Sequence, residues 1–196
     1  SSPLCDTFYA ALNRLDMVLL SHAGTELALD SQGRQHLGNP QLLRRALDAQ
    51  VKVIVCHCGT SGTSQDLDDP RLPETDNFTL FMRLFDDPSY EGLLFADISG
   101  MTLFNQVGNS LKEILARKDL HSRLFYGSDY PLPAVDILNQ NYALSLLGYI
   151  DEDIVEELDE IQDVNPLLYS FVLMRSLKHP DSGAKISEDL FRNRIP

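Results

Sequence analysis

The sequence predicts an α/β fold in which about four parallel strands alternate with helices. Four short runs of almost continuous apolar character are typical of strands that are covered on both faces, and they span residues 17–22, 51–57, 93–99 and 123–129. Successive runs begin about 30 to 40 residues apart, which leaves room for a helix and two loops in each interval. The segments between the runs carry helix-start signals and helical spacing of apolar residues.

Helix-start signals stand before and between the predicted strands. Residues 6–15 form a helical pattern that leads into the first strand. Asn39 and Pro40 suit the N-cap and the first helical position of a helix that runs over residues 42–49. The first two strands are therefore expected to alternate with helices.

Two further helices are predicted in the middle of the chain. Asp76 is the expected N-cap of residues 77–85, and Asn105 is expected to begin a helix over residues 106–117. The apolar residues expected on their buried faces are Phe78, Phe81 and Leu84 in the first, and Leu111, Ile114 and Leu115 in the second.

The pattern changes after Asp129, because Pro131 and Pro133 interrupt the chain. Three helices are expected to follow, at about residues 134–148, 151–162 and 166–178. The acidic character of the second indicates a solvated helix face. The last 18 residues have weak periodicity, so we expect one β/α domain over residues 1–178 and a tail or short docking segment over residues 179–196.

The composition of the chain argues against several functional classes. The formal net charge is −13, which disfavours nucleic-acid binding because that affinity comes largely from Lys and Arg on phosphates. No apolar stretch approaches the roughly 20 residues of a membrane span, and the start of the chain does not resemble a secretory signal. Three cysteines, an odd number, argue for a reducing compartment, so we expect a cytoplasmic protein without a disulfide framework.

Three of the four predicted strands end in a residue that can bind a metal ion: His22, His57 and Asp129. In parallel α/β folds, the side chains at the carboxyl ends of the strands converge on the active site. Strand alternation places Val51, Val53 and Val55 on one face with His57, and Val18 and Leu20 on one face with His22. Branched apolar residues beneath a polar residue at the rim favour a barrel over an open doubly wound sheet.

Four segments, SHAGTE, VIVCHCG, LLFADISG and RLFYGSDYPLP, resemble strands five to eight of the metal-dependent amidohydrolase superfamily. The nearest branch is the one typified by aminocarboxymuconate-semialdehyde decarboxylase and related hydrolases. The resemblance covers nearly the whole chain, and the strand that ends Gly-Ser-Asp-Tyr-Pro is its most specific part. It implies that this chain is the C-terminal half of a (β/α)8 barrel.

The resemblance also implies roles for the strand-end residues. His22 matches a metal-binding histidine, and His57 matches a histidine that binds a second metal ion or contacts the substrate. Asp129 matches the aspartate that binds or contacts the metal and accepts a proton from the attacking water. Histidine and aspartate ligands suit Zn²⁺, with Mn²⁺ as the alternative, and a divalent ion lowers the pKa of bound water toward ~7.

The sequence departs from the family pattern in one respect. Family members carry a His-x-His pair on strand one, and this chain has none; His36, His121 and His179 are isolated. Half of the barrel and two metal ligands are expected to be missing, so the chain alone is expected to hold metal weakly. We expect either a missing N-terminal half or self-association to cover the exposed edges at residues 17–22 and 123–129.

Other residues have weaker signals. Asp97, at the end of the third strand, is expected either to line the site or to hydrogen-bond a neighbour. Glu26 lies in a rim loop, where it is either a substrate contact or simply an exposed acid. Cys56 and Cys58 are expected to point away from the face of His57 and to be buried structural thiols. His121 is expected at the surface, at the opposite end from the site.

The polar segment 59–75 is expected to be a long loop on the catalytic side, in which Arg71 is a candidate for binding an anionic substrate group. The favoured function is metal-dependent hydrolysis, or a related decarboxylation, of a small organic substrate. The alternatives are a TatD-like metal-dependent nuclease and a barrel fragment that serves as a non-catalytic interaction module.

Overall fold

The computed structural model describes residues 2–26, 29–192 and 194. The chain falls into two compact units, the first ending at Asp97 and the second running from Ile98 to Arg194. The helices and strands of the first unit are α1 (Asp6–Arg14), β1 (Leu19–Ser21), α2 (Arg44–Asp48), β2 (Val53–Val55), β3 (Thr63–Gln65), β4 (Glu74–Asp76), α3 (Asn77–Phe85) and β5 (Leu94–Asp97). Those of the second are α4 (Asn109–Ala116), β6 (Leu124–Phe125), α5 (Asn141–Leu146), α6 (Val155–Val164) and α7 (Pro166–Ser176).

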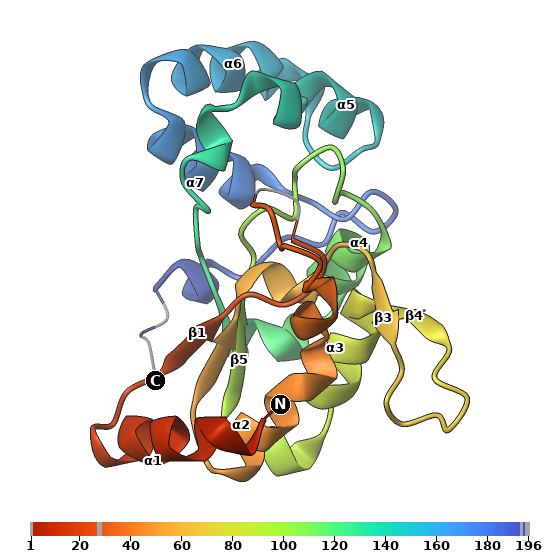
Figure 1. Ribbon diagram of the computed structural model, residues 1–196. Helices are drawn as coiled ribbons and strands as arrows, with labels where there is room; N and C mark the ends of the chain where they lie inside the picture. Colours follow the sequence, from red (N-terminus) through yellow and green to blue (C-terminus); the bar gives the residue numbers. More distant parts are fainter. Residues whose placement is uncertain (1, 27–28, 193, 195–196) are drawn as a thin grey trace. The chain divides into compact units, whose positions relative to one another are not determined.

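The four predicted apolar runs each contain a strand, so the α/β prediction is confirmed. Figure 1 labels two of these strands, β1 and β5. In the first unit, β1, β2 and β5 are neighbours in that order in one sheet. Strands β1 and β2 pair in parallel, as do β2 and β5. In the second unit, the Ile98 amide donates to the Phe125 carbonyl of β6 at 3.1 Å. Each strand is shorter than the apolar run that predicted it, because the ends of the runs enter loops.

The two faces of the β1-β2-β5 sheet differ in exposure. The register places Leu20 beside Ile54 and Ile54 beside Phe95, so these three side chains share one face. On that face Ile54 is 6% exposed, whereas Leu20 on the edge strand is 64% exposed. The opposite face carries four side chains that are fully buried, those of Val53, Val55, Leu94 and Ala96.

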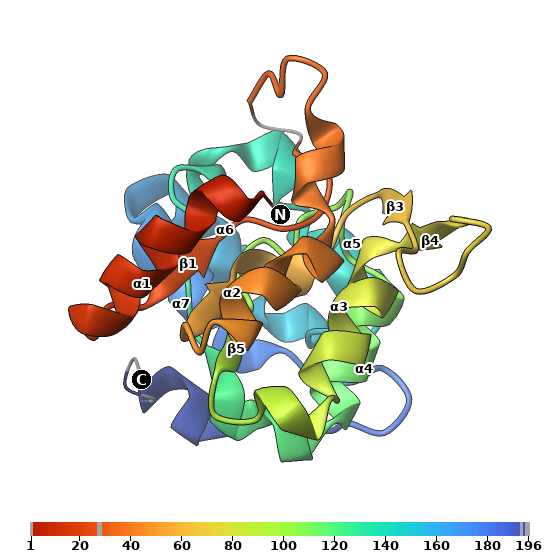
Figure 2. The same cartoon turned by 60° about the horizontal axis from the view of Figure 1, so that its bottom comes forward.

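Helix α3 packs against the 3₁₀ turn Pro40–Leu43, which leads into α2 (Figure 1 and Figure 2). The Asp76 carboxylate accepts from the Thr79 amide at 2.8 Å, and the Asn39 side chain accepts from the Gln41 amide at 3.0 Å, so both predicted caps are confirmed. Helix α2 begins as a 3₁₀ turn over Pro40–Leu43 before it becomes an α-helix. The predicted apolar side of α3 is buried, and α3 packs on β5.

The helix expected from Asn105 instead begins at Asn109, so that boundary was wrong. Gly108 precedes it in an extended conformation, with φ at 171°. Upstream, the Leu103 amide donates to the Gly100 carbonyl at 3.0 Å, which forms a turn where the helix was expected. The expected buried face of α4 is correct, since Leu111, Ile114 and Leu115 are all buried.

The helix expected over residues 134–148 is reduced to α5, at Asn141–Leu146. The side-chain amide of Asn139 donates to the carbonyls of Leu132 and Val135, both at 2.9 Å, and stabilises two short 3₁₀ turns there. The helices expected over residues 151–162 and 166–178 are present as α6 and α7, which pack together and with α5 (Figure 1).

The segment 59–75 is an ordered hairpin rather than an open loop, and β3 and β4 pair antiparallel within it. Figure 1 shows it extending from the rest of the first unit. It is held by Asp66, directly after β3, which forms an ion pair with Arg83 of α3 and accepts from the side-chain amide of Gln41 at 3.1 Å. These contacts explain why a polar stretch of this length is folded.

His121 is buried and not at the surface, so that expectation was wrong. Its Nε2 lies 2.8 Å from the Ile114 carbonyl, and its Nδ1 accepts from the Ser187 amide at 3.0 Å. The tail also buries Leu190 within the 3₁₀ turn Glu188–Arg192. Among the described residues, no helix has the length and apolar character that crossing a bilayer requires.

Candidate metal centre

The structure brings His22 and His57 together at the carboxyl ends of β1 and β2. The Nδ1 atom of His22 lies 2.9 Å from the Nε2 atom of His57. The ring centroids are 4.7 Å apart, and the two planes meet at 65°. Two of the three predicted ligands are therefore neighbours.

The strand alternation used to predict this pairing was wrong. Because Leu20 is in register with Ile54, alternation puts His22 on the face of Ile54 and His57 on the face of Val53 and Val55. The two histidines meet because β2 ends at Val55 and a left-handed turn follows it.

That turn is formed by His57 at φ 42° and ψ 35° and by Cys58 at φ 52° and ψ 29°. Left-handed conformations are uncommon outside glycine and are costly unless the surroundings hold them. The expected strand geometry for Cys56 and Cys58 is therefore also wrong, although Cys58 is a fully buried free thiol as predicted. Cys56 is only partly buried.

Asp97 at the end of β5 holds the turn in place. Its carboxylate accepts from the His57 amide at 2.9 Å, and its backbone carbonyl accepts from the Cys58 thiol at 3.2 Å. Burial raises the pKa of the Cys58 thiol well above its ordinary value. Of the two roles expected for Asp97, hydrogen bonding to a neighbour is the one that the structure shows.

The segments that follow β1 and β2 approach each other closely at Gly24. Its amide donates to the Gly38 carbonyl at 2.7 Å, and the next amide, that of Thr25, donates to the Ser61 carbonyl at 2.9 Å. Gly24 has φ at +102°, and a Cβ there would lie 2.1 Å from the Thr60 carbonyl oxygen. Only glycine fits this contact, which fixes the backbone two residues after His22.

This role of Gly24 was missed in the sequence. Similar close approaches occur at Gly38 and Gly62, where a Cβ would collide with Gly24 and Thr25 respectively. The available signal was the recurrence of glycine just beyond two strand-end histidines, in SHAG and CHCG. A glycine in such a position often marks a close backbone approach.

The electrostatic setting keeps His57 neutral. Burial, together with the neighbouring His22, lowers the pKa of His57 from 6.5 to about 4, while Asp97 and Glu26 oppose the shift. A neutral imidazole is the form that binds metal ions. The His57 Nδ1 atom is buried and has no hydrogen-bond partner among the described residues.

The other ring nitrogen of His22 sets its tautomer. His22 Nε2 lies 3.2 Å from the Gly24 carbonyl, which can only accept, so this nitrogen carries the proton. The Nδ1 lone pair then points toward His57. A histidine that donates its second N–H to a backbone carbonyl is the usual arrangement around a bound metal ion.

Glu26 lies beside the histidine pair. One of its carboxylate oxygens is 4.0 Å from His22 Nδ1, and the other accepts from the Leu29 amide at 3.0 Å. Glu26 is therefore near a candidate ligand, and its contact with a substrate stays a prediction.

Asp129 belongs to the second unit. It is exposed, has φ at +54°, and its backbone carbonyl accepts from the Leu132 amide at 3.0 Å. Its carboxylate borders Gly100, since a Cβ there would lie 3.4 Å from Asp129 Oδ2. That Asp129 joins His22 and His57 stays a prediction.

Arg71 is held by its own neighbour in the hairpin. Its Nε and Nη2 atoms donate to the Asp69 carboxylate at 3.0 and 2.7 Å, and its side chain is otherwise exposed. Binding of an anionic substrate group by Arg71 stays a prediction.

The facing ring nitrogens of His22 and His57 suit two neighbouring ligands of one metal ion. Within the described parts of the chain, no group of three or more His, Cys, Asp or Glu residues is arranged to hold one metal ion. The two facing imidazole nitrogens therefore support a part of a metal site and not a complete one.

No family model matches the chain, and no curated protein sequence matches it significantly. A solved structure that it resembles is the "Putative 2-Pyrone-4,6-Dicarboxylic Acid Hydrolase" from Pseudomonas putida, with a TM-score of 0.35 and 16% sequence identity. The match covers 89% of this chain and 65% of that protein, so the chain spans about two thirds of its length.

Proposed function

We propose that this chain is part of a metal-dependent hydrolase of the amidohydrolase type that acts on a small organic substrate. The observation that carries the proposal is the 2.9 Å distance between His22 Nδ1 and His57 Nε2. Bonds of about 2.0–2.1 Å from one tetrahedral Zn²⁺ to two nitrogens place those nitrogens about 3.3 Å apart. The hydrogen-bonded pair is slightly closer than this, so a small separation of the two rings would let both nitrogens bind one ion.

His22 and His57 are the proposed ligands, and Zn²⁺ is the proposed metal, with Mn²⁺ as the alternative. When bound, such an ion supplies Lewis acidity and lowers the pKa of bound water toward ~7. His57 contributes a neutral ring because it is buried. The Gly24 carbonyl orients His22 through its Nε2 proton.

Asp129 is proposed as a further ligand and as the general base. A carboxylate suits the role because it can accept the proton that an attacking water loses. A catalytic Zn²⁺ site usually has three protein ligands, so the histidine pair needs Asp129 or a residue from another segment.

We further propose that another polypeptide segment, either a missing N-terminal half or a second copy, covers the edge strand β1. The exposure of Leu20 there supports this, because an edge strand with an exposed apolar side chain invites pairing. Size-exclusion chromatography of the purified chain, with Leu20→Lys beside it, tests for the second copy. The expected result is a larger species that the substitution shifts toward a monomer.

Metal binding tests the histidine pair directly. The chain is stripped with a chelator and titrated with Zn²⁺ and then with Mn²⁺ by calorimetry, and its bound metal is measured by elemental analysis. His22→Ala and His57→Ala are each expected to weaken binding at least tenfold, while the exposed His36→Ala serves as the matched control. If the wild type and the three variants bind the metal with equal affinity, and circular dichroism shows that all four are folded, His22 and His57 are not the metal ligands.

Activity then separates the functions. Esters, lactones and phosphoesters are compared with single-stranded DNA as substrates of the metal-loaded chain. Hydrolysis of a small substrate that is lost in Asp129→Asn supports the proposal. Cleavage of DNA alone supports the TatD-like alternative instead.

A further inference from the structure

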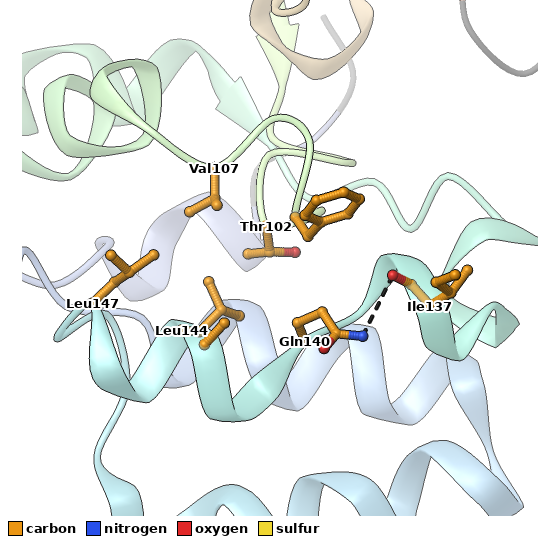
Figure 3. A pocket seen from close by; sticks show the side chains of 8 residues that line it. Thr102, Val107, Ile137, Gln140, Leu144 and Leu147 are labelled. Carbon is orange, nitrogen blue, oxygen red and sulfur yellow. Dashed lines mark hydrogen bonds between the residues drawn. The ribbon is translucent and has the colours of Figure 1, made fainter.

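The second unit contains a hollow that is built from its own residues. It has a volume of about 500 Å³ and lies between the turn that follows Gly100 and helix α5 with the residues that flank it (Figure 3). The residues that line it are Thr102, Phe104, Val107, Ile137, Gln140, Ala143, Leu144 and Leu147. This volume lies within the roughly 300 to 1,000 Å³ of typical small-molecule sites.

The hollow has a buried floor and an exposed rim, unlike a flat apolar face. Leu144 and Thr102 are 2% and 4% exposed, whereas Phe104 and Ile137 are 59% and 73% exposed. The Phe104 amide donates to the Leu138 carbonyl at 3.0 Å, which ties the two walls together. The shape is therefore set by the backbone.

Two polar groups are placed within this apolar lining. No hydrogen bond to another described residue engages the Thr102 hydroxyl, although the residue is buried. The Gln140 side-chain amide donates to the carbonyls of Asp136 and Ile137 at 3.2 and 3.4 Å, so both of its N–H groups are used and its Oε1 is left to accept. Figure 3 shows Thr102 among Val107, Leu144 and Gln140.

The residues that line the hollow favour an uncharged ligand. It includes no charged side chain, although the protein as a whole has a formal net charge of −13. An anion that enters would lose hydration without gaining a partner of opposite charge.

The geometry points to a binding site for a small, uncharged, ring-sized apolar molecule that carries one hydrogen-bond donor and one acceptor. The acceptor meets the Thr102 hydroxyl, and the donor meets Gln140 Oε1. The ring packs against Leu144, Val107 and Phe104. The site does not depend on the proposed metal chemistry, because none of its residues belongs to the His22–His57 pair.

The probes are benzamide and benzoate, which match in size and differ in charge at neutral pH. Each is titrated into the full chain labelled with ¹⁵N, and amide chemical shifts are followed by NMR. Benzamide is expected to shift the signals of residues 102–107 and 137–147 to saturation, with at least tenfold weaker binding of benzoate. Equal binding of the two overturns the proposed selectivity and with it the site.

Two matched variants test where the probe binds. Ala143→Phe fills the hollow and is expected to weaken benzamide binding at least tenfold, whereas Ala116→Phe at an exposed position of α4 is expected to leave it unchanged. Thr102→Val keeps the shape and removes the hydroxyl. It is expected to weaken benzamide about three- to tenfold and to leave toluene binding unchanged.

Retained benzamide affinity in Ala143→Phe overturns the proposal. A second result also overturns it. If the chemical shifts of these residues depend on protein concentration without ligand, and Ala143→Phe abolishes that dependence, a second copy of the chain occupies the hollow.

Discussion

The carboxylate of Asp97 accepts a hydrogen bond from the backbone amide of His57 at 2.9 Å. One acid at the end of β5 thus fixes the turn that brings His57 to His22 after β2 has ended. The backbone carbonyl of Asp97 engages the Cys58 thiol as well, so both left-handed residues of the turn depend on it.

Asp97→Ala is expected to lower the free energy of unfolding by about 1–3 kcal/mol, because it leaves a buried amide without an acceptor. Asp97→Asn keeps an oxygen at that position and is expected to cost less. Urea denaturation measures both, and NMR of the His57 ring reports whether the pair has separated. The exposed Asp119→Ala is the control, expected within about 0.5 kcal/mol of wild type. Equal losses in Asp97→Ala and Asp119→Ala would contradict the role of Asp97.

Gly24→Ala is expected to cost about 2–5 kcal/mol, because it adds left-handed strain and forces a Cβ against the Thr60 carbonyl. Gly183 also has a positive φ, at +69°, but nothing lies within 4 Å of its Cβ position. Gly183→Ala therefore measures strain alone, expected at about 1–2 kcal/mol. Thermal and urea denaturation compare the two variants. If Gly24→Ala lowers the free energy of unfolding no more than Gly183→Ala does, the backbone at Thr60 accommodates the added Cβ at little cost.

The pKa of His57 makes the stability of the metal-free chain depend on pH. Its folded value of about 4 lies below the ordinary 6.5, so the unfolded chain binds the proton more readily between these values. Stability is therefore constant above about pH 6.5 and falls by up to roughly 3 kcal/mol as pH falls toward 4.

Urea denaturation at several pH values, with an NMR titration of the ring, measures this effect. His57→Gln is expected to flatten the pH dependence of stability over this range, whereas His36→Gln, at an exposed position, is expected to leave that dependence unchanged. A ring that titrates near 6.5 in the folded protein would refute the prediction.

Leu20 and Ile54 are neighbours in register on one face of the sheet, yet their exposures differ tenfold, at 64% and 6%. Ile54→Ala is expected to cost about 2–5 kcal/mol, and Leu20→Ala less than about 1 kcal/mol. Guanidinium denaturation at low protein concentration compares them. A large loss in Leu20→Ala under these conditions would mean that the side chain is buried in solution.

Much of the fold follows from local sequence. The four strands were found because parallel strands that are covered on both faces are apolar throughout, and α3 was found because Asp76 caps it and its buried residues recur at helical spacing. The boundary at Asn105 was missed because Gly108 interrupts a pattern that otherwise looks continuous. The ordered hairpin was missed because its anchor, Asp66 with Arg83 and Gln41, joins residues far apart in the sequence.

By itself, the sequence determined which chemical groups stand at the ends of the strands, since a histidine directly after an apolar run can be read from order alone. Only the tertiary structure decided that His22 and His57 meet. Their contact requires a left-handed turn at residues 57–58, an acceptor from Asp97 forty residues away, and a backbone approach at Gly24 that excludes a Cβ. These are long-range constraints that override strand alternation, and no periodicity along the chain encodes them.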